Sequence, residues 1–233
     1  VLRGANAVMT ISPTFQRDLE RLSHRKIKLL TNGYDPADIP SGFSPKKKEA
    51  GKLHLVYSGI IDAIRNPIPL MEALKAEFES GNEEVKWTFV GKVSEQVQAY
   101  VNTDPWLKSR IHFAGYVSHS EVFGFYAKAD VLVLILTDTK NAQGNIPGKL
   151  FEYLATGIPV LALGDPNGDS AKILKDSGAG EVIAHADSKG IRTQLRLLMN
   201  SAFAKTNPAD LEKYSRRSLS FQLAKILNEH TLS

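Results

Sequence analysis

Short apolar runs alternate with amphipathic stretches along the chain beyond residue 52. Each run is rich in β-branched or aromatic residues, and after it comes a polar loop and then a stretch with helical periodicity. The predicted strands are Leu53–Tyr57, Trp87–Val90, Ile111–Phe113, Val131–Leu136, Pro159–Leu163 and Glu181–Ala184. The predicted helices are Asn66–Glu79, Ser94–Asn102, Ser118–Ala127, Gly148–Ala155, Ser170–Ser177, Ser188–Ala202, Pro208–Tyr214 and Arg217–Glu229. This alternation favours an α/β fold with a doubly wound parallel sheet, whose ligand crevice lies outside the carboxyl ends of the strands.

The first 45 residues follow a different pattern. Ser12 and Pro13 suit the N-cap and the first position of a helix, and a short strand follows that helix. The stretch Asp35–Gly51 is rich in Pro, Gly, Ser and Lys, which is typical of a linker. The chain begins at Val1 inside an apolar run, and we interpret it as a fragment. We therefore expect residues 1–45 to be the end of one domain plus a linker, residues 46–216 to be the α/β domain, and residues 217–233 to be a closing helix.

Composition narrows the class of protein. The chain has 233 residues, of which 42% are hydrophobic and 23% charged, as in ordinary globular proteins. No apolar run approaches the length of about 20 residues that a membrane span needs. The chain contains no cysteine, which excludes thiol chemistry and fits a cytoplasmic location. The formal charge of +4 is too mild to predict nucleic-acid binding.

The segment from residue 130 to residue 163 carries the clearest chemical signal. Its order is strand Val131–Leu136, polar Gly/Pro loop, helix Gly148–Ala155 and strand Pro159–Leu163, which is one βαβ unit. The first amides of such a helix point into the loop without partners and bind anions there. Lys149 adds a mobile positive charge, and Glu152, one turn later, is an acceptor for hydroxyl groups. These features suit a phosphate joined to a sugar.

Other loops at strand ends offer weaker signals. After the first strand of the α/β domain, Gly59 permits a close backbone approach, and a guanidinium at Arg65 can bind two phosphate oxygens. The alternative is that Arg65 is a solvated residue that pairs with Asp62. His119 follows the third strand, and we interpret it as a residue of a helix's first turn rather than as a catalyst.

Several reaction classes lack their motifs. The stretch Gly144–Leu150 has three residues between its glycines and Leu after the lysine, so it is not a P-loop. No G-x-G-x-x-G follows a strand, which argues against a dinucleotide cofactor. The chain has no G-x-S-x-G elbow, no H-E-x-x-H and no D-x-D pair, so we expect no metal site and no resident cofactor. Positive charge must come from Arg, Lys and helix amides.

Four stretches of the chain together resemble a known family. They are TNGYDP, YSGIIDAIRNPIPLMEALK, IHFAGYVSHSEVFGFYAKADVLVL and IPGKLFEYLATGIPVLALGDPNGDSAKIL. Their order and spacing resemble the glycosyltransferases of the GT-B fold, of the retaining group-1 or family-four type. Members have two Rossmann-like domains that face a cleft, and the carboxyl domain holds the nucleotide sugar. This chain resembles that carboxyl domain, with residues 1–31 as a remnant of the amino-terminal domain.

The resemblance implies roles for particular residues. Arg65 matches the basic residue that contacts the donor diphosphate. Glu152 matches the second acidic residue of an E-x7-E motif, which holds the ribose hydroxyls. Lys149 lies where the helix amino terminus meets the phosphates and the donor sugar, together with the amides of Gly148 and Leu150. These positions make Arg65, Lys149 and Glu152 the candidate catalytic residues.

Three positions concern the base and the sugar. Val117 matches the place where backbone groups read the base. The first Glu of E-x7-E is Gly144 here, and the arginine that usually follows the first-strand glycine is Ile60. We expect Gln143 or Asn145 to supply the missing sugar contact.

The resemblance implies the donor half of a retaining, metal-independent glycosyltransferase of bacterial polysaccharide biosynthesis. The donor would be a nucleotide diphosphate sugar, with uridine as the base, and the acceptor a saccharide or lipid-linked molecule on the missing amino-terminal domain. We expect the fragment to bind its donor without transferring sugar, and to self-associate weakly through the closing helix, while the full-length protein rests at the inner face of the membrane. The alternatives are a non-hydrolysing sugar-nucleotide epimerase of the same fold and a non-catalytic nucleotide-binding module.

Overall fold

The computed structural model describes residues 2, 4–200 and 211–231. Its centre is a six-stranded, fully parallel sheet with the strand order β5-β4-β3-β6-β7-β8. The strands are β3 (Lys52–Ser58), β4 (Glu84–Val90), β5 (Ile111–Gly115), β6 (Val131–Ile135), β7 (Val160–Leu163) and β8 (Gly180–Ile183). The chain runs outward from β3 to one edge and then from β6 to the other. The predicted doubly wound sheet is therefore confirmed, and a crevice is expected where the two halves part, beside the ends of β3 and β6.

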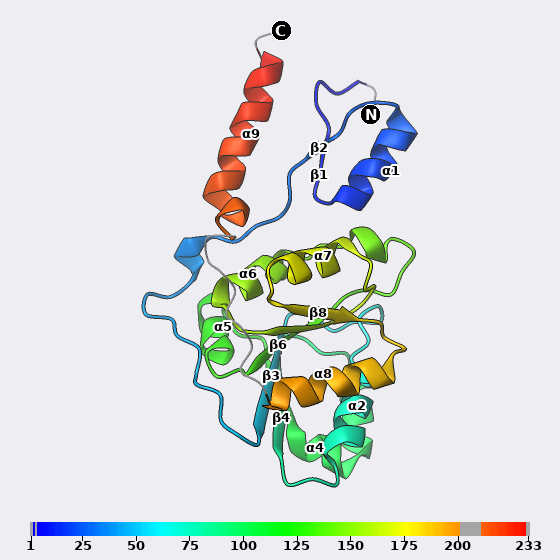
Figure 1. Ribbon diagram of the computed structural model, residues 1–233, viewed down its shortest axis with the longest axis vertical. Coiled ribbons are helices and arrows are strands. Elements are labelled where there is room, and N and C mark those ends of the chain that lie inside the picture. Colours follow the sequence, from blue (N-terminus) through cyan, green and yellow to red (C-terminus); the bar gives the residue numbers. More distant parts are fainter. Residues whose placement is uncertain (1, 3, 201–210, 232–233) are drawn as a thin grey trace.

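Helices cover both faces of the sheet (Figure 1). One face carries α2 (Ile68–Phe78), α3 (Glu95–Thr103), α4 (Pro105–Arg110) and α8 (Ser188–Asn200). The other face carries α5 (His119–Tyr126), α6 (Gly148–Thr156) and α7 (Asp169–Asp176). The central strand β6 shows why both layers form. Val131, Val133 and Ile135 join the first apolar cluster, whereas Leu132 and Leu134 join the second, because successive side chains of a strand point to opposite faces.

The amino-terminal segment and the last helix lie beyond the layer of α6 and α7 (Figure 1). Strands β1 (Met9–Thr10) and β2 (Lys28–Leu29) form a small parallel pair around α1 (Pro13–Ser23). The predicted N-cap is confirmed, because the Ser12 hydroxyl accepts the Phe15 amide at 3.3 Å. The last helix, α9 (Arg216–Thr231), runs beside this segment, and an ion pair of 3.0 Å joins Lys28 to Glu229.

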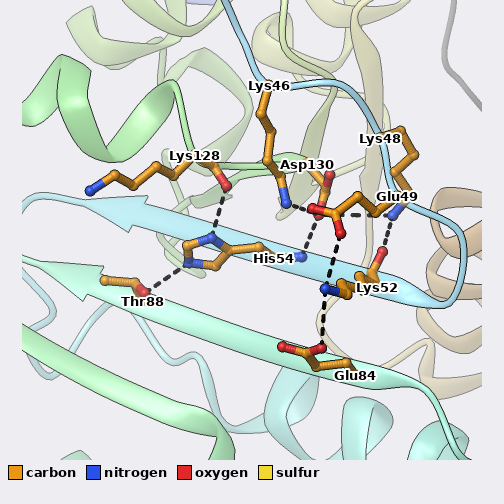
Figure 2. Close-up of polar contacts among 9 residues, drawn as sticks. All are labelled: Lys46, Lys48, Glu49, Lys52, His54, Glu84, Thr88, Lys128 and Asp130. Atoms are coloured by element: carbon orange, nitrogen blue, oxygen red, sulfur yellow. Dashed lines mark hydrogen bonds and ion pairs between the residues drawn. The ribbon is translucent and has the colours of Figure 1, made fainter.

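The predicted linker is anchored at both ends. It contains the 3₁₀-helix η1 (Pro36–Asp38), and Tyr34 forms a parallel bridge with Ser215 just before α9. At its other end, Lys46 pairs with the Asp130 carboxylate at 3.0 Å, while the same carboxylate accepts the His54 amide at 2.7 Å (Figure 2). The Asp130 side chain is only 2% exposed, so these partners balance the cost of burying its charge. The linker therefore lies along the domain rather than free of it.

The observed elements differ from the predicted ones in four ways. Helix α4 was not predicted, because Asp104 and Pro105 interrupt the helical pattern; in fact Asp104 caps a new helix by accepting the amides of Trp106 and Leu107. The short 3₁₀-helices η1 and η2 (Ala142–Gly144) also add to the prediction. The predicted helix Pro208–Tyr214 begins outside the described residues, and its described part contains the 3₁₀-helix η4 (Glu212–Tyr214). The end of the predicted helix Ser188–Ala202 also lies outside the described residues. Other boundaries shift by one to three residues.

Candidate functional site

The turns after β3, β4 and β5 lie against one another at the carboxyl edge of the sheet. The Gly59 amide donates to the Val90 carbonyl at 2.8 Å, and the Gly91 amide donates to the Gly115 carbonyl at 2.7 Å. Gly91 has a φ of +119°, and a Cβ atom there would lie 2.3 Å from the Gly59 carbonyl oxygen. Only glycine satisfies both constraints, so the three turns form one fixed wall of the site.

Lys149 reaches this wall from the second residue of α6. Its ammonium donates to the Ser58 carbonyl at 2.8 Å and lies 3.9 Å from the centre of the Tyr57 ring. Burial and then the nearby charge of Arg65 lower the pKa of Lys149 from its usual value to about 7, against the opposing effect of Glu152. The prediction of a mobile cation is therefore wrong. Lys149 is held in place, and a bound anion would favour its protonated form.

Two tyrosines hold the residue that accepts from Lys149. The Tyr153 hydroxyl accepts the Ser58 amide at 3.1 Å, and the Tyr126 hydroxyl lies 2.6 Å from the Ser58 hydroxyl. All three residues are buried. Ser58, Tyr126 and Tyr153 were not among the site residues predicted from the sequence. One signal was present in the sequence, since Tyr153 follows Lys149 by four residues and therefore shares its helix face.

Arg65 lies in the loop between β3 and α2. It forms an ion pair of 2.7 Å with Asp62, and both side chains are partly exposed. This pairing is the one that the alternative interpretation of Arg65 predicted. Its charge also acts on Lys149, so the two cations share one electrostatic environment. The structure thus shows the pairing with Asp62, while binding of a phosphate by Arg65 stays a prediction. An exposed carboxylate partner is readily exchanged for a phosphate.

Glu152 and the start of α6 line an open hollow of about 440 Å³. Residues 30–33, which follow β2, form its other walls together with Arg216 and one face of α9. The Glu152 carboxylate lies 3.5 Å from His119, the first residue of α5, which is the place predicted for that histidine. Glu152 and Lys149 line the same hollow, which confirms their predicted proximity.

The backbone of α6 presents fewer amides than the sequence suggests. Pro147 stands at the N-cap and supplies no side-chain cap. The Leu150 amide, predicted to face the phosphates, donates to the Pro147 carbonyl at 3.0 Å, and its side chain is buried. The Leu150 amide thus lies in the first turn of α6 but already has a backbone partner, and its contact with a phosphate stays a prediction. Within the described part of the chain, the amides of Gly148 and Lys149 keep no such partner, because a helix leaves its first amides unbonded.

Val117 lies in the loop between β5 and α5, at the same edge of the sheet. Its side chain packs against the second apolar cluster, next to the capping box that Ser118 forms with Glu121. This packing fixes the backbone around Val117, which is the part of the residue expected to contact a base.

The position of the missing glutamate is occupied from outside the domain. Gly144 is buried, and a Cβ atom there would lie 2.5 Å from the ring of Phe15 on α1. The adjacent Thr14 amide donates to the Asp169 carboxylate at the start of α7, at 2.9 Å. Of the two proposed substitutes, Asn145 donates its side-chain amide to Thr137 at 3.0 Å, while Gln143 is exposed. This arrangement favours Gln143 as the side chain available to a ligand.

The described residues contain neither a metal-binding cluster nor a membrane-spanning helix. Among residues 2, 4–200 and 211–231, no cluster of three or more His, Cys, Asp or Glu side chains has an arrangement that could hold a metal ion. In the same part of the chain, none of the helices combines the length and the apolarity that crossing a bilayer requires.

Comparison with known proteins identifies the fold and the family. The family of group 1 glycosyl transferases matches residues 52–201. The lipopolysaccharide outer core galactosyltransferase WaaB superposes with a TM-score of 0.75 at 15% identity, over 97% of this chain and 62% of that one. Sucrose-phosphate synthase from Thermosynechococcus elongatus superposes with a TM-score of 0.75 at 18% identity, over 98% of this chain and 59% of that one.

A third solved structure contains a nucleotide. HepE from Anabaena, solved in complex with UDP, superposes with a TM-score of 0.70 at 18% identity, over 97% of this chain and 64% of that one. No curated protein sequence matches the chain significantly. The chain thus spans about three fifths of the length of these structures, and at such identities the likeness establishes the fold.

Proposed function

The chain belongs to the group 1 glycosyl transferases, and we propose that it is the donor-binding half of an enzyme that transfers a sugar from a nucleotide diphosphate sugar. The observation that carries this proposal is the Lys149 ammonium, held beside Arg65 and the open amides of α6 at the carboxyl edge of a parallel sheet. This arrangement suits the diphosphate of a donor. The UDP bound to HepE supports uridine as the base.

The chemistry follows from the charge that develops during transfer. The barrier is departure of the diphosphate from the anomeric carbon, and negative charge grows on the leaving oxygens. This negative charge would be stabilised by two cations, Lys149 and Arg65, and by the amide dipole of Gly148. Such groups lower a barrier most when they are already in place and need no reorganisation. Glu152 binds the ribose hydroxyls in this proposal, and Gly59 and Val117 supply close backbone contacts.

Retention of configuration and independence from metal are part of the proposal. Attack by the acceptor on the face that the diphosphate leaves would retain the anomeric configuration and needs no nucleophile from the protein. The positive charges of Lys149 and Arg65 would neutralise the diphosphate, as a bound divalent cation does in metal-dependent enzymes. No resident cofactor is required.

The acceptor, the association state and the cellular location extend the proposal beyond this chain. A saccharide or lipid-linked acceptor would bind on an amino-terminal domain, across the cleft from Lys149. Phe221 and Leu227 of α9 are 68% and 52% exposed, which supports weak self-association through this helix. We place the whole protein in the cytoplasm, at the inner face of the membrane, in bacterial polysaccharide synthesis.

Binding of UDP without metal is the central test of this function. We expect the chain to bind UDP with the same affinity in EDTA and in added magnesium, because Lys149 and Arg65 already supply the positive charge. Titration calorimetry under both conditions measures this, with uridine as the control that lacks the diphosphate. Affinity that disappears in EDTA would contradict metal independence, and the absence of UDP binding in both conditions would contradict the donor site.

Glu152→Ala is expected to weaken the binding of UDP but not the binding of pyrophosphate. Loss of a hydrogen bond to a charged group costs about 1.5–3 kcal/mol, which is about 10- to 100-fold in Kd. The loss should appear for UDP and not for inorganic pyrophosphate, because the proposed partner of Glu152 is the ribose. Glu181→Ala, at an exposed position of β8, is the control. Equal losses for both ligands would show that Glu152 acts through Lys149 and His119 instead.

A further inference from the structure

Ser58 is held from two sides by the same helix. Lys149 and Tyr153 lie four residues apart on α6 and therefore share one face. Lys149 donates to the Ser58 carbonyl at 2.8 Å, and Tyr153 accepts the Ser58 amide at 3.1 Å. Two side chains of α6 thus bind both backbone groups of the last residue of β3.

The Ser58 amide needs this tyrosine because the sheet ends too early to satisfy it. The pairing of β3 with β6 stops at Val56 and Leu132, so β6 offers no carbonyl to Ser58. Ser58 is 7% exposed, and an unpaired buried amide would be costly. The Tyr153 hydroxyl supplies the missing acceptor, and Tyr126 from α5 holds the Ser58 side chain at 2.6 Å.

The carbonyl that binds Lys149 belongs to a peptide with glycine on its other side. Gly59 has a φ of +118°, a region that glycine enters freely, so the torsions of Gly59 do not by themselves fix the Ser58–Gly59 peptide. The Gly59 amide of this peptide donates to the Val90 carbonyl at 2.8 Å, which holds its β4 side. On the side away from β4, Tyr153 accepts the Ser58 amide and Tyr126 bonds the Ser58 hydroxyl.

We propose that Tyr153, supported by Tyr126, is a positioning residue that fixes Ser58 so that its carbonyl keeps the Lys149 ammonium at the anion site. The inference rests on the proposed function, in which that ammonium meets the donor diphosphate. Neither tyrosine touches the ligand in this arrangement. Their effect passes entirely through Ser58 and Lys149.

The charged groups and the burial around the Lys149 amine set its pKa, so a change in the position of the amine can be measured as a change in that pKa. Lys149 faces Arg65 and its partner Asp62 from the β3–α2 loop, Glu152 from its own helix, the Tyr57 ring from β3, and His119 of α5 beyond Glu152. Burial raises the pKa of Tyr153 to about 12, so its hydroxyl stays protonated and neutral. If Lys149 is released toward solvent, its pKa rises from about 7 toward the ordinary value for lysine.

Tyr153→Phe removes only the hydroxyl and tests the inference without any ligand. The titration of Lys149 can be followed by NMR of 13C-labelled lysine, with the resonance assigned by its loss in Lys149→Met. We expect Tyr153→Phe to move the titration upward by at least about one pH unit, and Tyr126→Phe to move it in the same direction by less. The control is Tyr100→Phe, whose exposed hydroxyl bonds Glu72 on the far side of the sheet and which should leave the titration unchanged. An unchanged titration in Tyr153→Phe would overturn the inference, and if that variant does not fold, Tyr126→Phe decides.

A double-mutant cycle with UDP measures the same coupling in the bound state. Tyr153→Phe should weaken UDP binding about tenfold, the size expected for a displaced charge-assisted hydrogen bond, and less than about twofold when Lys149→Met is already present. Equal losses in both backgrounds would mean that Tyr153 acts on the fold alone, which would overturn the inference. If the unmodified chain binds no UDP, the proposed function fails, and the titration of the free protein still decides the role of Tyr153.

Discussion

Lys149→Ala is expected to weaken the binding of UDP and of inorganic pyrophosphate by about 1.5–3 kcal/mol, or about 10- to 100-fold in Kd. The reason is that the variant loses the ammonium that lies against the wall of the site, 2.8 Å from the Ser58 carbonyl. Both ligands should lose equally, because the proposed partner is the diphosphate. Titration calorimetry with the two ligands measures the effect.

The same variant should change the pH dependence of binding. In the free protein the pKa of Lys149 is lowered to about 7, so the amine is largely neutral above that pH and must take up a proton to bind an anion. Affinity for UDP should therefore fall as the pH rises above about 7, and Lys149→Ala should remove this fall. Lys172→Ala, on the exposed face of α7, is the matched control. Pyrophosphate affinity that is unchanged in Lys149→Ala would exclude the proposed contact.

Gly144→Glu, which restores the first acidic residue of the E-x7-E motif, is expected to lower the free energy of unfolding by about 1–3 kcal/mol or more. The glycine is buried, and a Cβ atom at this position would lie 2.5 Å from the Phe15 ring. Either α1 must leave its place against η2, or the carboxylate must be buried beside an aromatic ring. Denaturant unfolding measures the loss.

Two further variants test whether Phe15 causes the loss of stability in Gly144→Glu. Phe15→Ala opens the space, so the cost of Gly144→Glu should be clearly smaller in that background than in the unmodified chain. Gly124→Glu, on the open surface of α5 where no atom lies within 4 Å of an added Cβ, should be close to neutral. If the two backgrounds lose the same stability, α1 does not exclude the glutamate, and the reason for Gly144 lies elsewhere.

The architecture of the α/β domain was predictable because it depends on local patterns. The central strands β6 and β7 are runs of apolar residues buried on both faces, and the helices that cover the sheet carry apolar stripes. Alternation of the two elements leaves a parallel sheet as the arrangement that buries every run. Helix α4 was not predicted because Asp104 and Pro105 indicate the end of the preceding helix, whereas Asp104 is also the N-cap of α4.

The location of the candidate site also followed from topology. Arg65 lies in the connection that follows β3 and Lys149 in the connection that follows β6, and the carboxyl ends of parallel strands meet at one edge of the sheet. Lys149 and Glu152 are one turn apart on a helix whose phase the sequence shows. Proximity of these side chains could therefore be predicted without coordinates. Their functional roles remain predictions.

Only the tertiary structure decided what each side chain touches. Lys149 and its acceptor Ser58 are 91 residues apart in the sequence, and Phe15 reaches Gly144 from another part of the chain. Periodicity determines the face of a helix or strand that is buried, whereas a hydrogen bond depends on positions within a few tenths of an ångström. That is why the sequence by itself determined the sheet, its helices and the edge that carries the charges. The tertiary structure alone decided that Lys149 is held rather than mobile, that the Leu150 amide is already bonded, and that two tyrosines lie behind the amine.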